Sequence, residues 1–232
     1  MKISTAALLA GLTLASAAHA DVLTYEYTAK INHLYKSEWM NYDVPIANTT
    51  LPGYSLNVGD EITGRFSIDT LTPLSYSVQY DGVSSSYYKG SAHNQMFLNI
   101  GQDGLKYASA YSDQYGPSVS VQDSGPAHGA DSVTLASNIS NAQGTTVLSL
   151  SFSDLSGAAL NGTGIPASLS ALNTPKFGYT FFSNAGFQAI TMDVGFTSMN
   201  LVSVSAVPEP GTYLMFLAGL PLLAWRRRAA RQ

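Results

Sequence analysis

The sequence predicts an all-β fold, an antiparallel β-sandwich of the jelly-roll-like kind, with helices expected only at the two ends of the chain. Apolar and polar residues alternate in several short windows between residues 21 and 206, which is the pattern of half-buried strands. Turn-forming dipeptides such as Asp81-Gly82 separate these windows. No window in this region keeps the 3.6-residue apolar period of an amphipathic helix. A closed barrel is the alternative architecture.

The first half of this region contains five expected strands. Residues 22–31 alternate most clearly, and a long polar connection is expected from His33 to Pro52. The next three strands are expected at Ile62–Ile68, Tyr76–Tyr80 and Met96–Ile100. Gly101-Gln102-Asp103-Gly104 then predicts a turn into residues 105–111, the clearest hairpin in the chain.

The second half contains weaker patterns. Residues 112–130 are rich in Gly, Ser, Pro and Asp and are expected to form a loop, as are residues 154–174. Strands are expected at Val133–Ile139 and around Leu148–Phe152, joined through Asn141–Gly144. Residues 190–206 keep one parity of apolar positions, which fits either one long bent strand or two strands joined by a bulge. The whole region therefore holds about eight expected strands.

Residues 1–20 have the composition of a secretory signal peptide. Lys2 supplies a positive charge, an apolar run extends from Ala6 to Ala18, and Ala18-His19-Ala20 provides the small residues that a signal peptidase requires. Cleavage after Ala20 and passage through the Sec machinery are therefore expected. The exported body, residues 21–206, has the length of one ordinary domain.

The charge and cysteine content of residues 21–206 exclude several classes of function. Six basic residues stand against fourteen acidic ones, a net charge of −8, so binding of nucleic acid through bulk charge is not expected. The chain has no cysteine, which excludes disulfides and every cysteine-based metal or catalytic site.

The C-terminal segment combines three features. Val207-Pro208-Glu209-Pro210 is an extended, amide-poor sequence, and the 13 residues Tyr213–Trp225 carry no charge. A helix of that length covers only about 20 Å of a hydrocarbon layer about 30 Å thick. An arginine cluster follows, which keeps this end cytoplasmic and the body in the periplasm: Arg226, Arg227, Arg228 and Arg231. An ordinary membrane anchor is the alternative.

These three features together resemble the PEP-CTERM sorting signal of Gram-negative bacteria, the presumed substrate of exosortase. The resemblance implies a transient inner-membrane intermediate, removal of the tail by exosortase, and delivery to the cell surface or the extracellular space. Such delivery usually occurs where exopolysaccharide or biofilm matrix is made. Residues 58–66 also resemble the poorly characterised β-rich bodies found ahead of such tails.

No catalytic constellation is evident in the exported body. There is no G-x-S-x-G motif, and His33, His93 and His128 stand apart in the sequence without metal-ligand spacing. Most acidic residues fall in expected turns, where Asp is favoured for its backbone geometry. We therefore expect a non-enzymatic surface or matrix protein without cofactor or metal. Two alternatives stay open: calcium in the oxygen-rich loop Asp113–Asp131, and a sugar-active enzyme with two spatially paired carboxylates.

The aromatic residues favour a further alternative, a carbohydrate-binding module of the sandwich class. The chain contains 14 tyrosines and two tryptophans, and several stand in expected loops where their rings would be free to stack on sugars. Tyrosine also favours strands, so part of this content is explained by the fold alone. The candidate glycan contacts are Trp39, Tyr42, Tyr54, Tyr87 and Tyr88.

Overall fold

The computed structural model describes residues 20–38, 43–51, 54–101, 106–109, 116–185 and 188–207. The expected signal-peptide helix with Ala18, the C-terminal helix, Pro208-Glu209-Pro210 and the arginine cluster lie outside the described residues. Residues Val22–Val204 form one compact unit. The terminal segments Met1–Asp21 and Ser205–Gln232 form a second unit, of which residues 20–21 and 205–207 are described.

The compact unit is built from β-strands. Its helical content among the described residues is one short segment, α2 (Gly125–His128). The strands are β1 (Ala20–Glu38), β2 (Val44–Ile46), β3 (Asn48–Leu51), β4 (Tyr54–Asn57), β5 (Glu61–Asp69), β6 (Leu74–Tyr80), β7 (Val83–Tyr88), β8 (Gln95–Ile100), β9 (Lys106–Ala108), β10 (Ser118–Asp123), β11 (Asp131–Ser140), β12 (Gly144–Asp154), β13 (Thr174–Ser183) and β14 (Gln188–Val207).

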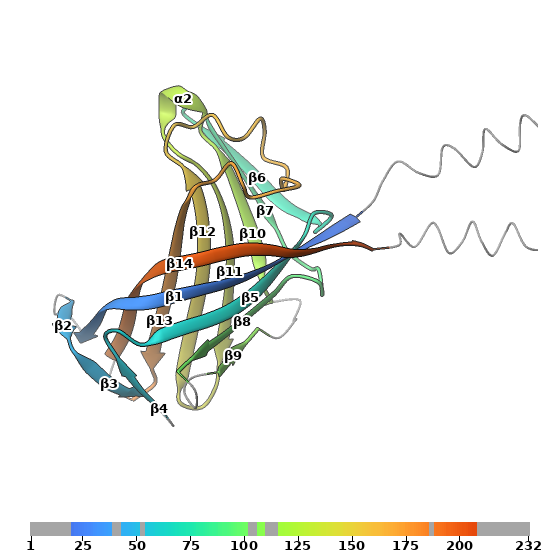
Figure 1. Ribbon diagram of the computed structural model, residues 1–232. Helices are drawn as coiled ribbons and strands as arrows, with labels where there is room; N and C mark the ends of the chain where they lie inside the picture. The colour runs from blue at the N-terminus through green and yellow to red at the C-terminus, as the bar shows by residue number, and fades with distance from the viewer. Residues whose placement is uncertain are drawn as a thin grey trace, which may run out of the picture. The chain divides into compact units, whose positions relative to one another are not determined.

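One sheet contains most of these strands, in the order β6-β7-β10-β11-β12-β13-β14-β1-β5-β8-β9, with β2 paired to β1 (Figure 1). Strands β10 to β14 follow each other as a meander of antiparallel neighbours. Strands β1 and β14 run in opposite directions, because Thr28 contacts Ser198 while His33 contacts Asp193. Strands β3 and β4 form a separate two-stranded sheet.

The long sheet curls so that strands far apart in this order face each other. Phe66 on β5 stacks on Phe152 of β12, with ring centroids 5.3 Å apart. The Tyr107 hydroxyl on β9 donates a hydrogen bond to the Ser137 carbonyl on β11, over 3.2 Å. The all-β antiparallel fold expected from the sequence is confirmed, and its two facing layers belong to one continuous sheet.

The core consists of the inward residues of these strands. On β1, the alternating residues of the 22–31 window are all buried: Leu23, Tyr25, Tyr27, Ala29 and Ile31. Tyr27 lies across from Gly64 on β5, and its ring occupies the space that a side chain at position 64 would need. Glycine is required there because any Cβ atom would clash with that ring.

The loop of residues 155–173 completes the core. Leu169 and Leu172 are buried, and the Leu169 amide donates to the Tyr25 hydroxyl over 3.1 Å. Asp131 is fully buried and accepts hydrogen bonds from the amides of Ser124 and Leu160, which ties this loop to β11. The expectation of a loop after Asp154 is confirmed, and its apolar residues explain why it packs inward.

Three hairpins expected from turn sequences are present. Asp81-Gly82 joins β6 to β7, β8 pairs with β9, and residues 141–143 join β11 to β12. Asp81 has φ +48° and Gly82 has φ +78°. Two consecutive positive φ angles define the type I′ turn, whose twist matches that of paired strands.

Other boundaries expected from the sequence were wrong. The polar connection 33–52 contains the end of β1 together with β2 and β3, and the expected loop 112–130 contains β10. Strand β7 was missed because Ser84, Ser85 and Ser86 hide its alternation. Of the two possibilities for residues 190–206, the structure has one long strand, β14. Strand β7 is set by pairing with its neighbours more than by an apolar pattern of its own, whereas β10 alternates serine with the buried Val119 and Val121 over too short a window to stand out.

Candidate functional site

An exposed row of tyrosines lies on the hairpin of β6 and β7. Tyr76 and Tyr87 face each other across the two strands, and their rings stack with centroids 4.5 Å apart and planes at 19°. Both side chains are exposed, at 53% and 38%. Tyr80, two alternations further along β6, is 81% exposed. The rings of this row therefore lie open to solvent, and no described residue buries them.

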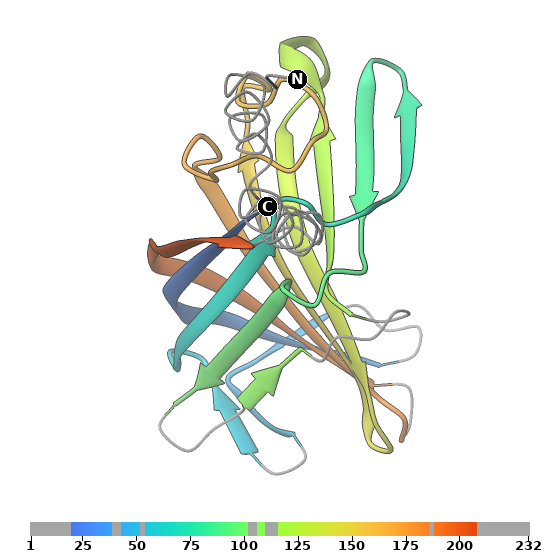
Figure 2. The same cartoon turned by 90° about the vertical axis from the view of Figure 1, so that its right-hand side faces the viewer.

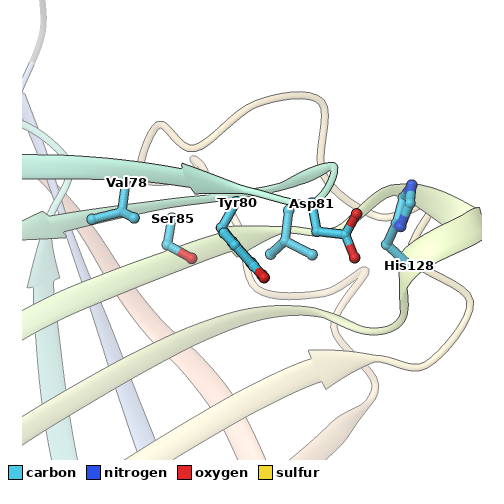
Figure 3. A pocket seen from close by; sticks show the side chains of 6 residues that line it. Val78, Tyr80, Asp81, Ser85 and His128 are labelled. Atoms are coloured by element: carbon cyan, nitrogen blue, oxygen red, sulfur yellow. The ribbon is translucent and has the colours of Figure 1, made fainter.

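A shallow cavity of about 280 Å³ lies at the turn end of the same hairpin. Figure 3 shows Val78, Tyr80 and Ser85 directed to the same side, with Asp81 beyond them and His128 reaching across from α2. His128 packs against Gly82, where an added Cβ atom would meet its ring. The cavity therefore combines an aromatic ring, an aliphatic floor, a carboxylate, an imidazole and a hydroxyl.

The position of His128 follows from the acidic residues behind it. Asp123, at the end of β10, accepts hydrogen bonds from the amides of Gly125 and Gly162. Together with the contacts of Asp131, these bonds fix the turn that carries α2. Both carboxylates are occupied by backbone amides, so they position the cavity wall and are not its ligand-binding groups.

This arrangement suits binding of a sugar ring better than bond cleavage. Flat aromatic side chains stack on the apolar faces of sugars, and a nearby carboxylate, imidazole and hydroxyl provide hydrogen bonds. Glycoside hydrolysis requires two carboxyl groups facing one bond. Asp81 is the single carboxylate among the residues that line this cavity.

A second, larger cavity of about 660 Å³ lies over β1, β5 and β8. Glu26 and Arg65 are cross-strand neighbours there, and Phe97 is 38% exposed beside them. One Asn99 oxygen at this cavity is buried without a hydrogen-bond partner. The cavity offers polar contacts to a ligand, with Glu26 as the single carboxylate of its lining.

The structure separates the five candidate glycan contacts. Trp39 and Tyr42 lie outside the described residues. Tyr54, Tyr87 and Tyr88 lie on strands β4 and β7, so their assignment to loops was wrong. Tyr87 is exposed, whereas Tyr88 is half-buried and donates its hydroxyl proton to the Thr163 carbonyl over 2.5 Å. Of the three described residues, Tyr87 alone presents its ring on the exposed row.

Tyr54 is turned toward the interior. Its pKa is raised by burial, and the buried Tyr179 beside it has its pKa raised by burial and by the neighbouring phenol of Tyr54. Tyr76 and Tyr80 were expected in a strand and were not among the candidate glycan contacts. One sequence feature could have indicated their exposure. Residues 83–88 are rich in serine, so the strand that pairs with Tyr76 and Tyr80 is too polar to belong to a core.

The remaining described histidines, His33 and His93, line neither cavity. His33 lies 3.0 Å from an Asp193 oxygen on the surface, and the His93 carbonyl accepts a hydrogen bond from Ser67. Within the described ranges, no group of three His, Asp or Glu side chains comes together as metal ligands would. In the same part of the chain, the structure contains no helix with the length and apolar character needed to cross a membrane.

Comparison with known proteins identifies the C-terminal segment. Residues 206–228 match the family model described as the PEP-CTERM protein-sorting motif. No curated protein and no solved structure shows significant similarity to the chain. The match contains Pro208-Glu209-Pro210 and Arg226 to Arg228 of the sequence prediction. The chain therefore carries a PEP-CTERM sorting signal behind a curled antiparallel β domain, which marks it as an exported protein that exosortase processes and sorts to the cell surface.

Proposed function

We propose that the β domain is a non-enzymatic component of the cell surface or of an extracellular, exopolysaccharide-rich biofilm matrix. The sorting signal supports this setting, since such tails direct export and surface delivery. The arrangement of carboxylates supports the absence of catalysis: Asp81 and Glu26 each stand alone in the lining of their cavities. Most other acids near the hairpin are bound to backbone amides.

Within this setting, the second candidate function is carbohydrate binding through the exposed tyrosine row. One observation carries it: Tyr76 and Tyr87 form an exposed stacked pair beside the cavity that Tyr80 and Asp81 line. Exposed aromatic rings have no part in holding the core together, and apolar side chains gathered on a surface commonly mark a binding site. A neutral or weakly charged polysaccharide fits the mixture of rings, hydroxyl and carboxylate.

Affinity measurement with the matrix polysaccharide of the producing cells tests this candidate. We expect Tyr76→Ala combined with Tyr87→Ala to weaken binding by about tenfold or more, since each lost stacking contact is worth about 0.5–1.5 kcal/mol. Phe182→Ala is the matched control, because Phe182 is a 49% exposed ring on β13, away from the hairpin. Phe97→Ala probes the second cavity. Undiminished binding by the tyrosine double variant contradicts the assignment to the hairpin.

Processing is tested by mass spectrometry of the protein recovered from cells that contain exosortase. The mature product should start after Ala20 and lack Trp225 and the arginines. Full-length chain recovered intact from the inner membrane of such cells would show that the tail is an anchor.

A further inference from the structure

Strand β6 is an edge strand that is exposed along its whole length. In the described part of the chain it is the first strand of the sheet order and pairs with β7 on one side. All seven residues are exposed, and four of them are large and apolar, with exposures of 51–81%: Leu74, Tyr76, Val78 and Tyr80. Figure 2 shows β6 and β7 as a long hairpin at the side of the sheet.

Proteins normally protect such an edge. The protection on β6 is confined to one end of the strand, where its register with β7 shifts between Leu74 and Tyr76. Its sequence, LSYSVQY, contains no charge and no proline. Charged residues, prolines and very short strands are the common ways to prevent an edge from pairing with another chain. The opposite end of the strand order shows the contrast, because β9 is three residues long. The β9 edge of the described sheet is therefore short, whereas the β6 edge is long enough to pair with another strand.

The turn geometry indicates which backbone groups of β6 are free. A two-residue type I′ turn closes on a pair of residues that exchange both hydrogen bonds, here Tyr80 and Val83. Because this pattern alternates along the strand, the amide and carbonyl of Val78 also point toward β7. Those of Gln79 and Ser77 point away from β7, toward the open edge. This edge can accept another antiparallel strand.

We propose that β6 pairs with β6 of a second copy of this chain in an antiparallel, two-fold symmetric arrangement. The charge distribution favours a second copy as the partner. The domain has a net charge of −8, so two copies repel each other over most of their surface, but the uncharged β6 adds no repulsion at the contact. A partner protein that binds through charges of opposite sign would find no charged side chain on β6 to pair with.

The side-chain pattern of β6 is also complementary to itself. In a two-fold antiparallel pair, directly opposed residues share the same parity and the same face of the sheet. Tyr76, Val78 and Tyr80 then oppose one another on one face, while Ser77 and Gln79 oppose one another on the other. The register shift between Leu74 and Tyr76 ends this regular alternation. The two exposed tyrosine rows would join into one aromatic surface across the dimer.

The size of the contact predicts a weak dimer. The regular stretch of β6 beyond the register shift, residues 76–80, extends over about 17 Å. Such a strip is small compared with standard stable interfaces, which bury about 1,600 Å². Dimerisation should therefore depend on protein concentration, and attachment of many copies to one surface or matrix would favour it by raising their local concentration.

Sedimentation velocity of the exported protein, purified from cells that process it, tests the proposal. The wild-type mass should rise toward twice the protomer mass as the concentration increases. Gln79→Pro removes an amide that faces the open edge, and Gln79→Lys places a charge there, so both variants should stay monomeric with an unchanged circular dichroism spectrum. Thr197→Lys, which adds the same charge at an exposed position on β14, should dimerise like the wild type.

Single cysteines provide a second measurement, because the chain has no cysteine of its own. Tyr76→Cys, Ser77→Cys and Val78→Cys are tested one at a time under mild oxidation. The position nearest the two-fold axis should form a disulfide-linked dimer, whereas Thr197→Cys should not.

Three results would overturn the proposal: a wild-type protein that is monomeric at all concentrations, a Gln79→Pro variant that still dimerises, or no cross-link at any of the three positions. Binding of an extended segment of a different protein to a monomeric wild type would assign the edge to that partner instead. The Gln79 variants keep Tyr76, Tyr80 and Tyr87, so the outcome is independent of whether the tyrosine row binds polysaccharide.

Discussion

Strands β1 and β6 have similar sequence patterns and opposite surroundings. Both alternate tyrosine with polar residues, yet Tyr25 and Tyr27 of β1 are 4% and 3% exposed while Tyr76 and Tyr80 of β6 are mostly exposed. Strand β1 lies inside the strand order, between β14 and β5, and the curled sheet covers its apolar face. Strand β6 lies at the edge. Alternation therefore predicts a strand without predicting whether another layer covers its apolar face.

This difference separates tyrosines that stabilise the core from tyrosines that are free to contact a ligand. Tyr27 packs its ring among Phe66, Phe177 and Phe196, and burial raises its pKa. Tyr76 packs on Tyr87 alone among described aromatic rings. Truncating a ring should thus reduce stability in the first group and ligand binding in the second.

The largest expected effect is on stability and comes from the covered face. Phe152 is fully buried and stacks on Phe66 across the two layers. Phe152→Ala should lower the free energy of unfolding by about 3–5 kcal/mol, because it leaves a cavity in the core. Tyr80→Ala should change it by less than about 0.5 kcal/mol. Urea unfolding of both variants checks the comparison, and similar losses would mean that the hairpin is covered in solution.

A somewhat smaller effect is expected at the buried carboxylate that holds the loop of residues 155–173. Asp131→Ala leaves the amides of Ser124 and Leu160 without their acceptor, which should cost about 1–3 kcal/mol. Hydrogen exchange should accelerate at the Leu160 amide. Asp154→Ala is the control, because the contacts of Asp154 with Ser156 and Ala158 are on the surface. Unchanged exchange at Leu160 would show that the loop is held by its leucines instead.

High pH should destabilise the covered region. Burial raises the pKa of Tyr27, Tyr54, Tyr107 and Tyr179 above the ordinary value of 10.0. Their contribution is therefore fully present below pH 10 and is lost as the pH rises above it toward the folded-state values. Each such phenol should lower the free energy of unfolding by up to about 1.4 kcal/mol per pH unit.

Denaturation of wild type and Tyr179→Phe from pH 9 to above pH 10 measures this slope. The variant should show a shallower decline, because one buried phenol no longer has to ionise. An equal decline of stability with pH in both proteins would contradict the conclusion that the Tyr179 phenol stays protonated in the folded state.

The smallest effect is expected at the turn of the exposed hairpin. Gly82→Ala forces a side chain into the left-handed region and against His128, which should cost about 1–2 kcal/mol. Gly164→Ala is the matched control, since no atom lies within 4 Å of the added Cβ there. Thermal unfolding compares the two. A neutral Gly82→Ala would show that the hairpin turn adapts, and that the cavity beside it is not preformed.

The fold could be predicted from sequence where an apolar face coincides with a core. The alternating residues of β1, β5 and β12 are buried as the pattern indicates, and Asp81-Gly82 forms the turn that its residue types favour. Strand β7 could not be predicted in this way, because its serines are extended where β6 and β10 offer hydrogen bonds to their backbone. Strand β10 was missed for another reason: its buried Val119 and Val121 alternate with serine over only a short window inside a polar stretch.

The candidate site was predicted less well, for a related reason. Tyr87 was placed among the candidate contacts, but Tyr54 and Tyr88 were assigned to loops and lie on strands with their hydroxyls directed to protein groups. Tyr76 and Tyr80 were treated as ordinary strand residues. Which tyrosines face solvent depends on where the sheet ends, and no local sequence window contains that information.

The sequence by itself determined where the protein goes and what class of fold it adopts. Sorting depends on short linear features, and strand formation depends on local alternation and turn residues, so both can be read without the tertiary structure. Only the tertiary structure decided which alternating faces are covered and which edge stays open. Coverage and pairing are made by segments far apart in the chain, such as Phe66 with Phe152, and they exist only once the sheet has curled.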